Sequence, residues 1–168
     1  MTTFAITTAE IGDAPAILAL QYEAYQSEAR LYDDWRIPPL TQTLDELVGE
    51  FHSGIVLKAT AGAALLGSVR ARQVGGTAHI GRLCVAPDMQ RRGIGGALLG
   101  QIEAAFPRAE RYELFTGSRS EGNIRLYQRN GYAVIREQRL SENVTLVFLG
   151  KPNEITAHID AAPACRTP

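Results

Sequence analysis

A short segment rich in glycine and arginine has the residue types that bind an anion. It follows an apolar run and precedes a helical pattern, and it consists of Gln90, Arg91, Arg92, Gly93, Ile94, Gly95 and Gly96. Its glycines let a ligand approach the backbone closely, and the first N–H groups of a helix have no partners within the helix. Its arginines add positive charge at the helix end that attracts anions. The segment therefore predicts a site for a pyrophosphate group.

Two other phosphate-binding motifs do not fit this segment. A Walker loop requires Gly-Lys followed by Ser or Thr, which the segment lacks. The dinucleotide fingerprint requires Gly or Ala at the position of Leu98. On the residues alone, a tight strand-to-helix turn with solvated arginines remains the alternative interpretation.

The wider sequence resembles the GNAT superfamily of N-acetyltransferases. The segment 90–95 matches that family's Gln/Arg-x-x-Gly-x-Gly/Ala loop, and residues 123–132 are similar to its second motif. The predicted strand over 80–85 and the turn Val85-Ala86-Pro87 also agree with the family. The resemblance implies acetyl-CoA as the donor, a primary amine of a small molecule as the acceptor, and direct attack in a ternary complex. Homodimers are common in the family, so a homodimer is compatible with the resemblance.

The resemblance also implies roles for residues near the loop. Leu83, Cys84 and Val85 would line the pantetheine arm, with peptide groups of Leu83 and Val85 pairing with it and the Val85 N–H facing the thioester oxygen. Asn123 would contact the arm, and Tyr127 would be the general acid for the departing thiolate. Without the resemblance, Tyr127 would be interpreted as a core aromatic. The Cys84 thiol is expected to be buried and inert, because its neighbours are apolar.

The general base is less well defined than the general acid. Some family members carry a glutamate twelve residues before the tyrosine, where this chain has Phe115. Others carry a glutamate eleven residues before the loop, where this chain has His79. Since an imidazole accepts a proton near neutral pH, His79 is the candidate base. The alternatives are that His79 is only a polar residue on a strand, that Glu113 is the base, or that the amine loses its proton to water.

The region between the first two predicted helices usually shapes the acceptor pocket in this fold. Aromatic and acidic side chains gather there, with Tyr25, Tyr32, Asp33 and Trp35 as the candidate substrate-binding residues, accompanied by Tyr22, Glu28 and Asp34. Carboxylates beside aromatic faces would attract a cationic amine. The alternatives are that the aromatic residues belong to the core and that the acidic residues lie in a solvated loop.

Three other functions share part of this pattern. A non-catalytic acyl-CoA-binding or sensor module would retain the glycine loop, and a nucleotide-binding enzyme would use it for another phosphate. An acetyltransferase for protein or peptide amines would differ only in its acceptor.

Composition argues against several classes of protein. The chain has 168 residues, 45% of them hydrophobic, and a formal net charge of −1. This balance is typical of a globular domain and argues against nucleic acid or a membrane as a partner. Among the 17 basic residues only Lys58 and Lys151 are lysine, an excess of arginine that genome composition explains outside the loop. Cys84 and Cys165 form neither a disulfide framework nor a metal motif, and the N-terminus lacks a signal-peptide pattern, so we expect no metal and a cytoplasmic location.

The predicted elements form one mixed α/β domain over residues 1–150, with a peripheral tail over 151–168. Strands are expected at 4–8, 55–60, 64–73, 77–85, 112–117, 132–140 and 145–149. Helices are expected after an N-cap at Asp13, from a capping box at Thr43 to His52, and over 93–106 and 121–130. The pair Pro38-Pro39 predicts a loop over 31–40. The resemblance implies a mostly antiparallel, twisted sheet of about seven strands, flanked by four helices and splayed between strands four and five.

Overall fold

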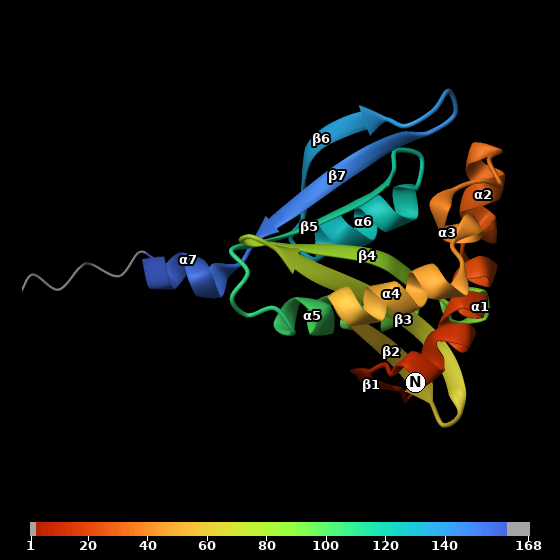
Figure 1. Cartoon of the computed structure of the whole chain (residues 1–168). Helices are drawn as coiled ribbons and strands as arrows, with labels where there is room; N and C mark the ends of the chain where they lie inside the picture. The colour runs from red at the N-terminus through yellow and green to blue at the C-terminus, as the bar shows by residue number, and fades with distance from the viewer. Residues whose placement is uncertain (1–2, 161–168) are drawn as a thin grey trace, which may run out of the picture.

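A seven-stranded sheet forms the centre of the protein. The computed structural model describes residues 3–160, and the strand order across the sheet is β1-β2-β3-β4-β5-β7-β6 (Figure 1). All neighbouring pairs are antiparallel except β4 and β5. The strands are β1 (Ala5–Thr8), β2 (Ile55–Ala61), β3 (Ala64–Val74), β4 (Thr77–Val85), β5 (Arg111–Gly117), β6 (Ala133–Arg139) and β7 (Thr145–Pro152).

β4 and β5 separate soon after they begin. Their parallel pairing joins Thr77, Ala78 and His79 to residues 111–113 and then stops. In Figure 1 the two strands diverge beyond these paired residues, and α6 (Glu121–Arg129) lies beside the opening. The predicted splay between the fourth and fifth strands is therefore confirmed. It leaves one edge of the second half of β4 without a strand partner.

Helices pack on both faces of the sheet. α5 packs against β2, β3 and β4 in the main core, whereas α1 and α4 form a second, smaller core. Leu57 of β2 belongs to the main core and its neighbour Val56 to the second, so the two cores lie on opposite faces. The other described α-helices are α1 (Ala14–Ala24), α2 (Gln26–Tyr32), α3 (Pro38–Thr41), α4 (Leu44–Ser53), α5 (Ile94–Ala104) and α7 (Glu154–Asp160).

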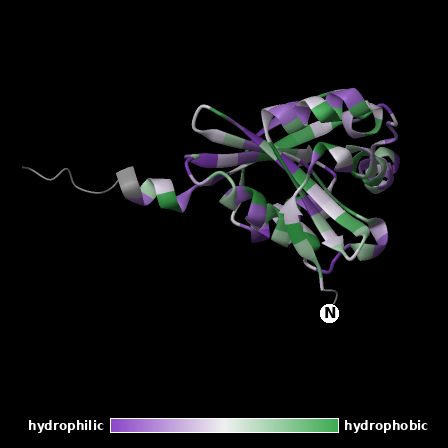
Figure 2. Ribbon diagram, turned by 60° about the horizontal axis from the view of Figure 1, so that its bottom comes forward, coloured by the Kyte–Doolittle hydropathy of each residue, from purple (hydrophilic) through white to green (hydrophobic). Residues whose placement is uncertain are grey.

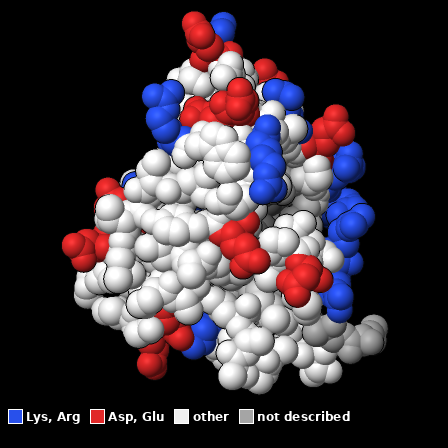
Figure 3. Space-filling model, turned by 90° about the vertical axis from the view of Figure 1, so that its right-hand side faces the viewer, with Lys and Arg blue, Asp and Glu red and all other residues white. Residues whose placement is uncertain are grey.

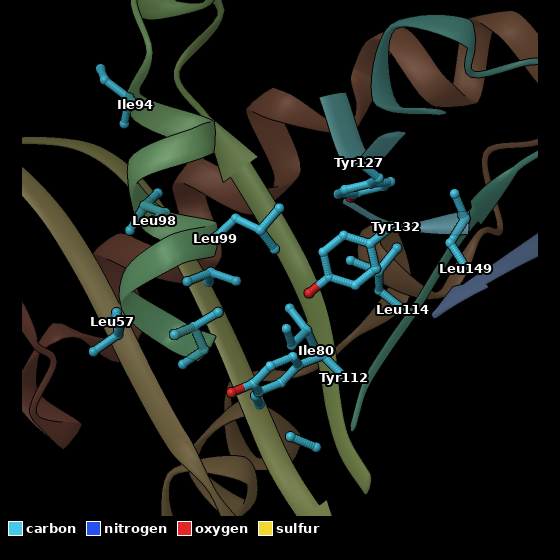
Figure 4. Packing of buried hydrophobic residues seen from close by; sticks show 14 of the residues in the cluster. Leu57, Ile80, Ile94, Leu98, Leu99, Tyr112, Leu114, Tyr127, Tyr132 and Leu149 are labelled. Carbon is cyan, nitrogen blue, oxygen red and sulfur yellow. The ribbon is translucent and has the colours of Figure 1, made fainter. Parts of the chain in front are cut away.

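The main core extends from α5 to α6 and the neighbouring strands. Figure 4 shows Tyr127 and Tyr132 close together, with Leu99 of α5 on one side and Leu114 and Leu149 on the other. The two tyrosine rings meet edge to face, with centroids 6.2 Å apart. Hydrophobic residues run along the central strands, while the helices carry both hydrophobic and hydrophilic residues (Figure 2). This packing fixes α6 relative to the sheet.

The predicted strands are confirmed, and the four predicted helices correspond to α1, α4, α5 and α6. The loop predicted over 31–40 is wrong at both ends, because α2 continues to Tyr32 and α3 begins at Pro38. Proline fits the first turn of a helix, where its nitrogen needs no partner within the helix. The capping box of α4 is confirmed: the Glu46 N–H donates to Thr43 Oγ1 at 3.2 Å, and the Thr43 N–H donates to the Glu46 carboxylate at 2.8 Å.

The start of α1 differs from the prediction in its side-chain contacts. Asp13 is the N-cap residue, but its side chain makes no capping hydrogen bond. Its carboxylate instead accepts from the Glu10 N–H at 2.8 Å and from Lys58 Nζ at 2.7 Å. These hydrogen bonds lower the pKa of Asp13, with the larger effect from Lys58. Asp13 thus joins the start of α1 to β2.

The chain continues as ordered structure beyond the expected boundary at residue 150. β7 runs to Pro152, and the buried Asn153 donates to the Ala109 carbonyl at 2.7 Å before α7 begins. Cys165 lies outside the described residues. Within residues 3–160, no helix is both long enough and apolar enough to span a membrane.

Candidate active site

A cavity of about 640 Å³ opens beside the free edge of β4. We call it the first cavity; β4, the loop after it, α5, α6 and the junction of α1 with α2 form its walls. Most of the predicted site residues line it, namely Tyr25, Leu83, Cys84, Val85, Gln90, Arg91, Gly93, Ile94, Gly95, Gly96, Asn123 and Tyr127. The fold thus brings segments that are far apart in the sequence around one space.

The loop before α5 turns sharply at the cavity wall. Arg91 and Gly93 both have left-handed backbone conformations, with φ values of 60° and 83°. Glycine adopts this conformation without strain, which explains its use at the N-cap of α5. Arg92 follows Arg91 in the loop but is not among the residues that line the cavity. The loop therefore offers one lining guanidinium and the N–H groups of the first turn of α5.

Gly95 keeps the cavity open between α5 and its neighbours. A Cβ atom at this position would lie 3.4 Å from Leu126 Cδ2 and 3.9 Å from Val85 Cγ2. Backbone N–H groups beside a guanidinium are the donors that a pyrophosphate accepts. The residues present therefore fit the phosphate end of coenzyme A.

Leu83 and Val85 turn their peptide groups toward the free edge of β4. The Ala86 N–H donates to a β3 carbonyl at 2.8 Å, and Cys84 is in register with β3. In an antiparallel ladder, alternate residues direct their peptide groups to the same neighbouring strand. The peptide groups of Leu83 and Val85 consequently face away from β3. The Val85 carbonyl accepts from Gln90 Nε2 at 3.4 Å, which ties the loop to the strand.

The Cys84 side chain is buried, as the sequence predicts. Burial raises the pKa of the Cys84 thiol to about 12. The thiol therefore stays protonated at neutral pH, and a protonated thiol is a poor nucleophile.

Tyr127 projects from α6 into the main core and also lines the first cavity. Burial raises the pKa of its hydroxyl, and the negative charge of Glu28 raises it further. The hydroxyl therefore holds its proton at neutral pH. One turn earlier on α6, Asn123 donates from Nδ2 to Thr116 Oγ1 at 3.2 Å, which orients its carboxamide. α6 thus presents one hydroxyl and one amide to the cavity, and Thr116 of β5 orients the amide.

The four predicted acceptor residues do not meet in one place. Tyr25 lines the first cavity, but the buried Tyr32 hydroxyl is held by Ser120 Oγ at 2.9 Å and accepts the Arg119 N–H at 2.8 Å. Asp33 and Trp35 are exposed and are not among the lining residues of this cavity. Figure 3 shows the side of the molecule on which α2 and α3 lie, where acidic and basic side chains are scattered over a mainly uncharged surface.

One acidic residue of that region does reach the cavity. Glu28 of α2 lines it, and its carboxylate accepts from Ser120 Oγ at 2.5 Å. The carboxylate also lies close enough to Tyr127 to raise the pKa of its hydroxyl. Glu28 is therefore better placed than Asp33 to interact with a ligand in the first cavity.

His79 lines a different cavity of about 530 Å³, on the face of the sheet that α1 and α4 cover. This second cavity has walls from α4, β3, β4 and β5. Ala78 and Ile80, the neighbours of His79 in β4, are buried in the main core, so His79 projects from the opposite face. Burial lowers the pKa of His79, and the positive charges of Arg72 and Arg111 lower it further. The imidazole is therefore neutral at neutral pH.

Residues 16–132, which contain β4, the loop, α5 and Tyr127, match the family model described as "Acetyltransferase (GNAT) family". The chain belongs to this GNAT family. The sequence-based resemblance is thus confirmed, and no curated protein sequence matches the chain.

Solved acetyltransferase structures share the fold of this chain at low sequence identity. The PaiA N-acetyltransferase of Thermoplasma acidophilum, in complex with coenzyme A, is 17% identical with a TM-score of 0.72 over 89% of this chain and 99% of that one. The ribosomal-protein-S18-alanine N-acetyltransferase of Escherichia coli is 16% identical with a TM-score of 0.75 over 89% and 94%. YncA of Salmonella typhimurium, with its cofactor acetyl-CoA, is 18% identical with a TM-score of 0.71 over 90% and 94%.

Sequence reasoning missed part of the first cavity. The lining residues that it did not name are Ala24, Ser27, Met89, Gly122, Leu126 and Arg129. Helical spacing from Asn123 would have indicated Leu126, because residues three apart share a helix face. Arg82 of the second cavity was also missed, because no sequence pattern signals the backbone irregularity described below.

Proposed function

We propose that this GNAT protein transfers an acetyl group from acetyl-CoA to a primary amine of a small molecule. The first cavity is the observation that supports the proposal best, because the predicted anion-binding loop, the free edge of β4 and Tyr127 all line it. Coenzyme A or acetyl-CoA in two of the similar solved structures supports the choice of cofactor.

The chain has separate groups for each part of the cofactor. Acetyl-CoA, when bound, supplies an acetyl thioester and a pyrophosphate. Arg91 and the N–H groups at the start of α5 would hold the pyrophosphate. Peptide groups of Leu83 and Val85 would bind the pantetheine arm as an added strand does, and Asn123 would contact the arm from the opposite wall. Tyr127 lines the same cavity as these groups, so the thioester would lie near its hydroxyl.

The proton transfers follow from the states of the side chains. The amine nitrogen forms a bond to the carbonyl carbon as the carbon–sulfur bond breaks, and the Val85 N–H stabilises negative charge on the carbonyl oxygen. Tyr127, which burial and Glu28 keep protonated, donates its proton to the departing thiolate and regains one from solvent. The proton lost by the amine passes to neutral His79 or to water.

Binding and turnover test the proposal in sequence. We expect acetyl-CoA and CoA to raise the thermal denaturation midpoint more than ATP does. We then expect thiol release from acetyl-CoA that depends on an amine from a panel of small molecules and peptides. Stronger stabilisation by ATP would indicate a nucleotide-binding enzyme, and acetyl-CoA binding without amine-dependent thiol release would indicate an acyl-CoA sensor. Turnover of peptides alone would replace the small-molecule acceptor by a protein.

A further inference from the structure

The second cavity contains an arginine without a partner. Arg82 of β4 lines this cavity and is half-buried. Its Nε is buried and makes no hydrogen bond, and its guanidinium forms no ion pair with any residue among 3–160. A buried donor without an acceptor destabilises a fold, and such donors are rare in native proteins. A bound ligand could therefore provide the hydrogen-bond acceptor that Arg82 Nε lacks among residues 3–160.

The backbone at Arg82 is held in an unfavourable conformation. Its φ is 50°, in the left-handed region that side chains other than glycine rarely adopt. The register of β3 with β4 shifts here, so that Val69 alone lies opposite Arg82 and Leu83. Bulges of this kind redirect side chains and occur often beside active sites. The bulge places the Arg82 guanidinium at the cavity instead of leaving it in a regular ladder.

The neighbouring charges do not neutralise Arg82. The Arg70 guanidinium has its own partners. It donates to Gln21 Oε1 at 3.1 Å and to Gln42 Oε1 at 2.7 Å, and it pairs with Glu50, so this carboxylate pairs with Arg70 and not with Arg82. Glu50 is the one carboxylate among the described lining residues, against three arginines, Arg70, Arg72 and Arg82. The second cavity thus has an excess of positive charge.

The second cavity adjoins the first at β4. Arg82 lines the second cavity and Leu83, the next residue, lines the first. Tyr25 lies in the wall of the first cavity; burial raises the pKa of its hydroxyl, and Arg82 lies close enough for its positive charge to oppose that rise. The two cavities meet at the split between β4 and β5, where Phe115 forms a wall of the second cavity. An acceptor in the second cavity would therefore reach the thioester through this split, from the side of the sheet that α4 covers.

We propose that the acceptor is an amine that also carries a carboxylate, and that Arg82 binds this carboxylate. The inference rests on the proposed acetyl transfer. A guanidinium binds a carboxylate with two parallel hydrogen bonds, which would satisfy the buried Nε and orient the amine. His79, in the same cavity, would face the amine end of such an acceptor. This proposal predicts an acceptor that carries a negative charge, whereas Asp33 and its aromatic neighbours predicted a cationic acceptor.

The test uses matched pairs of amines with the full chain. Glycine, longer ω-amino acids and the common L-α-amino acids would each be compared with their carboxamides in the thiol-release assay. We expect at least one amino acid to exceed its amide in kcat/KM by about 10- to 100-fold, the range for a hydrogen-bonded charge. Arg82→Gln should reduce that ratio to near one, and Arg82→Lys should retain part of it.

Binding is measured separately from turnover. Calorimetry with the corresponding N-acetyl amino acids and their amides, at saturating CoA, reports on the carboxylate site without catalysis. Carboxylate-dependent binding that Arg82→Gln abolishes would support the site even if no amine were acetylated, in which case only the proposed function would fail. Equal turnover or binding of acids and amides, or a preference unchanged in Arg82→Gln, would overturn the inference.

A control variant separates this effect from a general loss of arginine. Arg139 is exposed on β6 and donates to the Ser141 carbonyl at 3.2 Å, outside both cavities. Arg139→Gln should leave the acid-to-amide ratio unchanged. Thermal denaturation of Arg82→Gln shows whether the variant is folded; a folded variant that keeps the preference contradicts the assignment.

Discussion

His79 and Glu113 form the last pair of the parallel ladder between β4 and β5. Beyond this pair the strands separate, and Gly81 of β4 and Phe115 of β5 line the second cavity without pairing to each other. His79 therefore lies where the sheet opens. Because its side chain faces the second cavity, the imidazole lies on the side of the proposed acceptor site and not on that of the proposed cofactor site.

A pH–rate profile tests His79 as the base. Activity should fall as the pH drops through the pKa of His79, which burial and the arginines lower below its ordinary value of 6.5. His79→Ala should remove this acidic limb and lower kcat by about 100-fold or more, as expected for a lost general base. The measurement is kcat/KM between about pH 5 and pH 9.

Arg72→Gln provides the matched test of the electrostatic cause. The positive charge of Arg72 disfavours the protonated imidazole, so its removal should raise the pKa of His79 and move the acidic limb to higher pH. A limb that is unaltered in both variants would mean that the amine loses its proton to water.

Tyr127→Phe tests the general acid. The substitution removes the hydroxyl and retains the ring that packs against Tyr132. We expect kcat to fall by about 10²- to 10⁴-fold, because proton donation to the thiolate is lost, while the affinity for acetyl-CoA changes little. Steady-state thiol release gives kcat, and calorimetry gives the affinity.

Tyr112→Phe is the control for the loss of a tyrosine hydroxyl. The Tyr112 hydroxyl donates to the Glu103 carbonyl at 3.2 Å, and Tyr112 does not line the first cavity. This variant should lose about 1 kcal/mol of stability and keep its kcat. Equal kcat values for the two variants would show that Tyr127 is only a core aromatic.

Most of the fold was predictable because its signals are local. Hydrophobic periodicity indicated the strands and the long helices, and the capping box at Thr43 marked the start of α4. One exception was α3, whose first residues are Pro38 and Pro39. Proline is compatible with a helix start as well as with a loop, so the sequence alone could not distinguish the two.

The site was predictable only in part. The loop and Tyr127 lie in motifs, and the structure brings them to one cavity. The acceptor residues depend on tertiary geometry: Asp33 follows α2 in a left-handed conformation and is exposed, whereas Glu28 points to the cavity. Arg82 depends on a register shift between β3 and β4, which results from pairing across the sheet and not from a local sequence pattern.

Arg91→Gln tests the phosphate end of the site. Removing the guanidinium should weaken acetyl-CoA binding by about tenfold, because a charge-assisted hydrogen bond to phosphate is lost. The affinity for S-acetyl-pantetheine, which lacks the phosphates, should not change. Arg108→Gln, an exposed change outside the first cavity, serves as the control. A similar loss for both ligands would indicate a distorted loop instead of a phosphate contact.

Two glycines of the α5 region should respond to alanine in opposite directions. Gly100 lies within α5, is exposed, and a Cβ atom there would meet nothing within 4 Å. Gly100→Ala should therefore stabilise the protein by about 0.5–1 kcal/mol, since alanine loses less backbone entropy in a helix. Urea denaturation measures the change, and acetyl-CoA affinity should stay the same.

Gly93→Ala should destabilise the protein by about 1–2 kcal/mol, because the φ of 83° would hold the new alanine in the left-handed backbone conformation. No atom crowds this position, so the cost comes from the backbone conformation alone. Relief of that strain would move the first turn of α5, whose N–H groups form the proposed anion site, and acetyl-CoA affinity should fall together with stability. Normal affinity in a destabilised Gly93→Ala variant would separate the turn from the binding site and would contradict the role given to the helix start.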